Sequence, residues 1–136
     1  MKIIVCLDDN GGMMFNSRRQ SRDKAVIEDV LRLSEGEKLY IDEYSEKLFS
    51  NAVGRYIISR DMLGEASRGE LCFVENKPVS GIIDRVEEII IYRWNRVYPA
   101  DVYFDVDLKR EGFALVEECD LCGNSHEKIT KEIFTR

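Results

Sequence analysis

The chain has 136 residues, of which 44% are hydrophobic and 34% are charged. These values are typical of a globular protein with one core and exclude a disordered tail. The net charge of -6 argues against broad nucleic-acid binding, because phosphates require a basic face. No apolar run approaches the roughly 20 residues that span a bilayer. We therefore expect one soluble domain over residues 1–136, with neither nucleic acid nor membrane as partner.

The chain begins with a strand-like segment followed by a turn. Residues 3–7 (IIVCL) form a continuous apolar run, which predicts a strand buried on both faces. The run is too short for the core of a signal peptide, so we expect a cytoplasmic protein whose four cysteines stay reduced. Residues 8–12 (DDNGG) predict a turn, because Asn and Gly tolerate positive φ. A short apolar return over residues 13–15 and a polar loop over residues 16–20 follow.

A helix is predicted from about residue 21 to residue 34. Ser21 is positioned to cap it, and Asp23 falls in its first turn, where a negative charge suits the helix dipole. Apolar residues recur at helical spacing, at Val26, Val30 and Leu33.

The remaining predicted elements are short. Strands are predicted over residues 39–41, 55–59, 71–74, 89–92, 113–118 and 129–134. Short helices or turns are predicted over residues 45–49, 62–67 and 78–86, the last with Pro78 near its first position. This order predicts an α/β protein with three layers, α/β/α. Its central sheet is mixed, mostly parallel, and ends in an antiparallel C-terminal hairpin.

The order and spacing of these segments resemble the dihydrofolate reductase family. Residues 89–92 (IIIY) and 100–104 (ADVYF) resemble the family's apolar-Tyr-Leu-Thr strand and its Gly-Asp-Thr/Ala-x-Phe segment. Residues 124–126 (NSH) resemble the family's Asn-Ser-His-like stretch before the final strand. Residues 54–59 (GRYIIS) resemble a strand that carries Arg and Ile-Ile in the middle of the family's chain. The resemblance covers nearly the whole chain and implies the family's fold.

The resemblance fails at the first segment that holds the family's cofactor, NADPH. The family's Gly-Arg/Lys-x-Thr motif places a helix N-terminus and a basic side chain against a phosphate. Asp42, Glu43, Tyr44 and Ser45 stand in its place. Two carboxylates there would repel a phosphate.

The second cofactor segment also departs from the family. A Gly-Gly turn in the family lets the backbone approach the pyrophosphate closely. Glu75, Asn76, Lys77 and Pro78 stand there instead, and Pro78 lacks a backbone donor. We therefore expect no cofactor, and NADPH only if the chain is a reductase after all.

One site residue of the family has a counterpart, Asp23. The resemblance implies an acid there that hydrogen-bonds a pteridine and helps to protonate it. The competing interpretation, which we prefer, is an acidic residue at a helix N-terminus with a structural role. The Trp that precedes the family's acid is missing, with Arg18 near its place, and Tyr92 replaces the Thr that braces the acid.

Two functional hypotheses follow. The first is a diverged member with the scaffold and a small-molecule cleft that has lost usual NADPH binding, and that binds a ligand or a partner. The alternative is an NAD(P)H-dependent reductase of a pterin-like or other heterocyclic substrate that uses Asp23. A protein partner at Arg18, Arg19 and Arg22 is a further option, although adjacent arginines are commonly just solvated.

Metal chemistry is not expected. Cys119 and Cys122 form a Cys-x-x-Cys pair, but a zinc site needs about four ligands, and His126 is the only histidine. Cys6 and Cys72 are predicted to be buried in strands. Ribonuclease Z activity is rejected, because that enzyme binds two zinc ions through a histidine-rich motif.

Overall fold

The structure, a computed structural model, describes residues 1–136 and contains a seven-stranded mixed sheet in the order β5-β4-β6-β1-β7-β10-β9. A second sheet has the order β3-β2-β8. The strands are β1 Lys2–Leu7, β2 Gly12–Phe15, β3 Arg18–Arg19, β4 Leu39–Ile41, β5 Ile57–Ile58, β6 Leu71–Phe73, β7 Glu88–Arg93, β8 Val102–Tyr103, β9 Ala114–Leu121 and β10 Ile129–Thr135. The helices are α1 Lys24–Leu33, α2 Glu46–Phe49 and α3 Met62–Glu65, with two 3₁₀ helices, η1 Glu43–Ser45 and η2 Ser80–Arg85.

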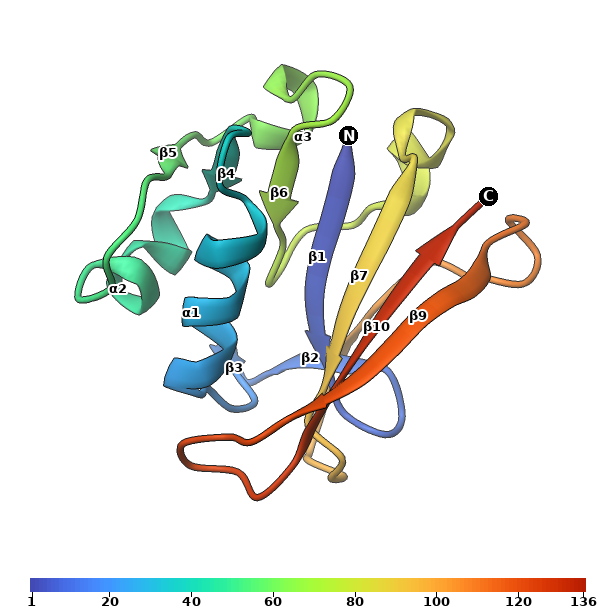
Figure 1. Cartoon of the computed structure of the whole chain (residues 1–136). Helices are drawn as coiled ribbons and strands as arrows, with labels where there is room; N and C mark the ends of the chain where they lie inside the picture. Colours follow the sequence, from blue (N-terminus) through green and yellow to red (C-terminus); the bar gives the residue numbers. More distant parts are fainter.

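The main sheet confirms the predicted topology. Strand β1 is central and runs parallel to β6 and β7, and β4 runs parallel to β5 and β6. Strand β10 is antiparallel to β7 and to β9. Figure 1 shows β9 and β10 as a long orange-red hairpin at one edge, whose closing loop extends toward the first turn of α1.

Two hydrophobic clusters lie one on each face of the sheet. Each packs the sheet against helices, which gives the predicted three layers. Alternation along β1 separates them, because successive side chains of a strand point to opposite faces. Ile3, Val5 and Leu7 belong to the cluster that includes residues of α3 and η2. Ile4 belongs to the cluster that includes α1 and α2. Residues 3–5 and Leu7 are buried, as a strand covered on both sides requires.

The helix α1 shows one correction to the prediction. Its apolar face is formed by buried residues that include Val26 and Val30, as expected. Asp23, however, is the N-cap and lies before the first turn, since its backbone is extended (φ -151°, ψ 130°) and its side chain accepts from Ala25 N. No helix is long and apolar enough to cross a membrane.

Three further local predictions need correction. Residues 16–20 are not all loop, since Arg18 and Arg19 form β3 and pair with Phe15 and Met14 of β2. Cys6 is only partly buried, unlike Cys72. The helix predicted over residues 78–86 is the 3₁₀ helix η2, which starts only at Ser80. Gly81 and the β-branched Ile82 have weak α-helical propensity, which favours the shorter form.

Candidate functional site

The carboxylate of Asp23 joins the start of α1 to the loop between β9 and β10. Its Oδ1 accepts from Ala25 N at 2.9 Å and from Asn124 N at 2.8 Å. Its Oδ2 accepts from the backbone N–H of Ser125 at 2.8 Å and of His126 at 3.0 Å, and from Ser125 Oγ at 3.2 Å. Asp23 is only 3% exposed. The N-cap of one element thus also orders a loop about a hundred residues later in the chain.

These contacts set the charge of Asp23. Burial alone would raise the pKa of the carboxyl, because it penalises the charged form. Hydrogen bonds from Asn124, His126, Ala25 and Ser125 outweigh burial and hold the pKa far below its ordinary value of 3.8. Asp23 is therefore ionised at neutral pH and can act only as an acceptor.

His126 continues the network from Asp23 to Ser21. Its Nδ1 lies 2.9 Å from Asp23 Oδ2, and its Nε2 lies 2.9 Å from Ser21 Oγ and 3.2 Å from the hydroxyl of Tyr98. Because the ionised carboxylate only accepts, Nδ1 carries a proton, and in the tautomer with a single ring proton Nε2 is the acceptor. The ring stacks on Trp94, with centroids 4.6 Å apart. Trp94 itself is buried.

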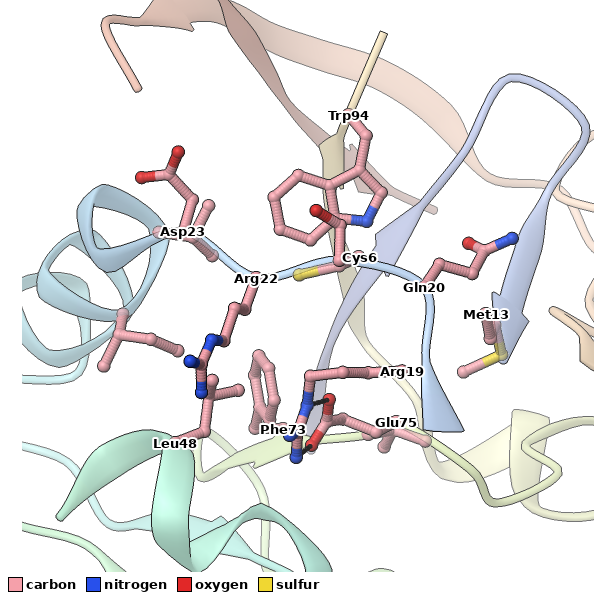
Figure 2. Close-up of a pocket in the computed structure, with 14 residues that line it drawn as sticks. Cys6, Met13, Arg19, Gln20, Arg22, Asp23, Leu48, Phe73, Glu75 and Trp94 are labelled. Atoms are coloured by element: carbon pink, nitrogen blue, oxygen red, sulfur yellow. Dashed lines mark hydrogen bonds and ion pairs between the residues drawn. The ribbon is translucent and has the colours of Figure 1, made fainter. Parts of the chain in front are cut away.

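Behind this network, the space beside Asp23 is nearly filled. The cavity there has a volume of about 20 Å³ and is lined by residues that include Cys6, Arg19, Glu75 and Trp94. This volume holds about one water molecule, whereas ligand pockets typically measure about 300–1,000 Å³. Figure 2 shows the Asp23 carboxylate directed away from Arg19 and Glu75.

The segment that carries the three arginines (residues 18–22) forms one network with the two segments that stand in place of the family's cofactor motifs (residues 42–45 and 75–78). Arg19 forms a two-pronged ion pair with Glu75, from Nε at 2.8 Å and Nη2 at 3.0 Å (Figure 2). Ser45 Oγ donates to Glu75 Oε1 at 2.8 Å, and Tyr44 Oη accepts from Arg19 N at 3.0 Å. The Arg19 guanidinium lies over the Tyr44 ring, 4.7 Å from its centroid. Glu75 thereby satisfies the charge of Arg19 within the chain.

Three other residues of the two cofactor segments, Asp42, Glu43 and Lys77, are also paired within the chain. Asp42 caps η1 by accepting from Tyr44 N at 3.2 Å, and it lies 3.4 Å from Lys77 Nζ. Glu43 pairs with Arg60 at 3.0 Å on the surface. Asn76 and Pro78 are exposed.

A carboxylate also occupies the amide groups that follow Pro78. Asp105 accepts from Val79 N at 2.9 Å and from Ser80 N at 3.1 Å. Burial would raise the pKa of Asp105, but hydrogen bonds from Ser80 and Val79 lower it below 3.8. These two amides, at the start of η2, are thus already paired with an anionic group of the chain itself.

An open groove of about 540 Å³ lies next to Ser21. Its lining consists of Arg18, Arg19, Ser21, Arg22 and Tyr44. Of the three arginines, only Arg19 forms an ion pair, and Arg18 and Arg22 are exposed. The three arginines named from the sequence therefore do share one surface feature.

Two other features lie apart from this site. A broad hollow of about 1,460 Å³ between α1 and the segment around residues 51–57 is lined by interleaved acidic and basic side chains. Cys119 and Cys122 are free and exposed, and no three His, Cys, Asp or Glu side chains are grouped to hold a metal ion.

A cytoplasmic location remains a prediction.

Sequence reasoning identified Asp23 and the arginines but missed three partners. Ser21 was expected to cap α1, yet its hydroxyl contacts His126. His126 was considered only as a metal ligand. Asp105 was not singled out at all. The only signal for His126 was that residues 124–126 resemble the family's Asn-Ser-His-like stretch. Nothing in the sequence placed His126 opposite Asp23, 103 residues earlier.

Comparisons with known proteins bear on the fold. No protein-family model matches the chain, and no curated protein matches it. Among solved structures, the chain is similar to a dihydrofolate reductase from Enterococcus faecalis complexed with NADP(H) and RAB-propyl. The TM-score is 0.68 at 9% sequence identity, over 99% of this chain and 95% of that one. The chain therefore has the dihydrofolate reductase-like fold.

Proposed function

We propose that this chain binds a carboxylate-bearing ligand, or an acidic group of a protein partner, in the groove of Arg18, Arg19 and Arg22, and does not bind NADPH in the reductase manner. The observation that carries the proposal is that the chain's own carboxylates take the place of an external anion. Carboxylates of the chain itself, from Asp42, Glu75 and Asp105, occupy the positive groups and amides around the two cofactor segments.

The groove supports the binding half of this proposal. Arg18 and Arg22 are exposed and make no ion pair, so their guanidinium groups can take a carboxylate in a two-pronged arrangement. Arg19 lines the groove beside them and is held in place by Glu75 and Tyr44, and because Glu75 already satisfies its charge, Arg18 and Arg22 are the arginines available to a ligand. Because the net charge of -6 opposes the approach of an acidic ligand, the attraction must come locally from the guanidinium groups of the groove.

Three observations weigh against the reductase alternative. Both carboxylate oxygens of Asp23 already accept hydrogen bonds, from the start of α1 and from the loop at residues 124–126. The neighbouring cavity of about 20 Å³ has no room for a pteridine ring. A protonated Asp23 would also be needed as an acid, and its lowered pKa opposes that.

A binding titration tests the proposal. Citrate is titrated calorimetrically at low ionic strength against the wild type, the double variant R18E/R22E and a control, R68E, which reverses an exposed charge elsewhere. We expect the groove variant to lose at least tenfold in affinity, and the control to bind like the wild type. Equal binding by the wild type and R18E/R22E would contradict the groove.

NADPH binding to the wild type is measured in a separate titration, from the change in NADPH fluorescence. We expect no saturable binding below about 1 mM, which corresponds to about -4 kcal/mol. Tight, saturable binding, or turnover of dihydrofolate that D23N abolishes, would instead support the reductase alternative.

A further inference from the structure

Ser21, His126 and Asp23 form a continuous hydrogen-bonded series that the resemblance does not account for. Ser21 Oγ lies 2.9 Å from His126 Nε2, and His126 Nδ1 lies 2.9 Å from Asp23 Oδ2. A hydroxyl, an imidazole and a carboxylate in this order have the roles of nucleophile, general base and orienting acid in acyl-transfer enzymes on unrelated folds. We propose that Ser21 is a nucleophile that cleaves esters bearing an acidic group.

The imidazole is held in the orientation that a general base requires. Asp23 fixes the proton on Nδ1, so the lone pair of Nε2 is directed at the Ser21 hydroxyl. Stacking on Trp94 and a side-chain exposure of 6% restrict rotation of the ring. The backbone N–H of His126 also donates to Asp23, which fixes the residue at its main chain.

Tyr98 shares this site. Its hydroxyl lies 3.2 Å from His126 Nε2 and 3.5 Å from Ser21 Oγ. The Tyr98 hydroxyl therefore competes with Ser21 for the lone pair of Nε2. Without that hydroxyl, His126 Nε2 can accept only from Ser21. The substitution Y98F is therefore expected to increase the reactivity of Ser21.

Ser21 is reachable from solvent and has donors beside it. It lines the arginine groove and is only partly buried. The backbone N–H groups of Ser21 and Arg22 donate no hydrogen bond within the chain, so they are free to bind the oxygen of a reacting carbonyl. The segment leads directly into the N-terminus of α1, whose dipole favours negative charge there.

The groove indicates the substrate class, and this part rests on the proposed function. Arg18 and Arg22 flank Ser21, so an ester whose other end is a carboxylate can place its carbonyl at the hydroxyl. Ser21 Oγ bonds to the carbonyl carbon while His126 Nε2 takes the hydroxyl proton. The ester C–O bond then breaks, and the leaving alcohol takes that proton from His126. Water, deprotonated by His126, releases the acid and restores Ser21.

Covalent labelling with a neutral fluorophosphonate, read by mass spectrometry, tests the nucleophile without using the groove. One adduct on the peptide that contains Ser21 is expected in the wild type and in S67A, a control at an exposed serine. S21A should not be labelled, and H126Q should be labelled about 100-fold more slowly. Y98F should be labelled at least as fast as the wild type. An unlabelled wild type, or labelling that persists in S21A, would overturn the proposal.

Ester hydrolysis then separates the nucleophile from the groove. The wild type should hydrolyse mono-4-nitrophenyl succinate with a lower KM than neutral 4-nitrophenyl acetate, and R18E/R22E should lose that preference but keep the fluorophosphonate adduct. If Ser21 forms the fluorophosphonate adduct but the KM values of the two esters are equal, the acidic substrate class is contradicted. Citrate binding without an adduct contradicts the nucleophile and leaves the proposed function standing.

Discussion

Asp23 lies just before the first turn of α1, inside which it was predicted, and it has a second structural role that was not predicted. The sequence placed an acid at the start of a helix, and the structure makes that acid the N-cap and the anchor of a distant loop. Each oxygen faces only donors. This arrangement predicts high sensitivity to any change that places a donor at the same position.

The substitution D23N makes that sensitivity measurable. The Asn amide retains one acceptor but directs an NH₂ group at the donors of Ser125 and His126 or at Ala25 and Asn124. We expect a loss of about 2 kcal/mol in the free energy of unfolding, because buried donors lose their acceptor. Urea unfolding reports it, with D9N at an exposed, unpaired position as the matched control. An unchanged midpoint for D23N would show that the loop is anchored by other contacts.

The β9–β10 hairpin is the element that delivers His126 to α1. Its strands are long, and β9 is exposed along nearly its whole length, so the hairpin gains little from burial near its turn. Its position depends on the loop, where Gly123 approaches the backbone closely. A Cβ at Gly123 would overlap the carbonyl oxygen of His126 and lie 2.9 Å from Asp23 Oδ2.

Substitution of this glycine tests the element directly. We expect G123A to cost about 1–3 kcal/mol through overpacking and to displace His126 from Asp23. The contacts are with backbone and a buried carboxylate, so neither can move aside cheaply. G81A is the control, because a Cβ there meets nothing within 4 Å and φ is not positive. Thermal unfolding should separate the two variants, and equal melting temperatures would contradict the expected overlap.

For the whole molecule, buried carboxylates join parts of the fold that are distant in sequence. Asp8 accepts from Tyr98 N at 3.0 Å, and Asp29 accepts from Tyr92 Oη at 2.6 Å and lies 2.9 Å from Lys131 Nζ. Burial would raise the pKa of each carboxyl, but the hydrogen bonds from Tyr98 and Tyr92 and their neighbours lower it below 3.8. The buried Asp23 and the exposed Asp105 share this direction, so four acids have lowered pKa values in the native protein.

These shifts predict the pH dependence of stability. Near pH 3–4 the unfolded chain binds more protons than the native protein, whose carboxyls have lower pKa values. The free energy of unfolding therefore rises with pH in this range. Stability should be complete above pH about 5, and should fall as the pH drops below the unfolded value of about 3.9. Urea midpoints at pH 7, 5 and 3, at constant ionic strength, measure it. A midpoint equal at pH 5 and pH 3 would contradict the native contacts of these acids.

The sequence by itself determined the order of strands and helices and the mixed sheet, because hydrophobic runs and periodicity are local properties of the chain. It also located the two segments whose residues depart from the family's cofactor motifs, since charge and glycine content can be read directly. It did not predict the small β3-β2-β8 sheet, because β2 pairs with β8 far along the chain. Only the tertiary structure brought His126 between Ser21 and Asp23 and placed Asp105 on the amides of η2, since hydrogen bonds between distant residues leave no periodic pattern in the sequence.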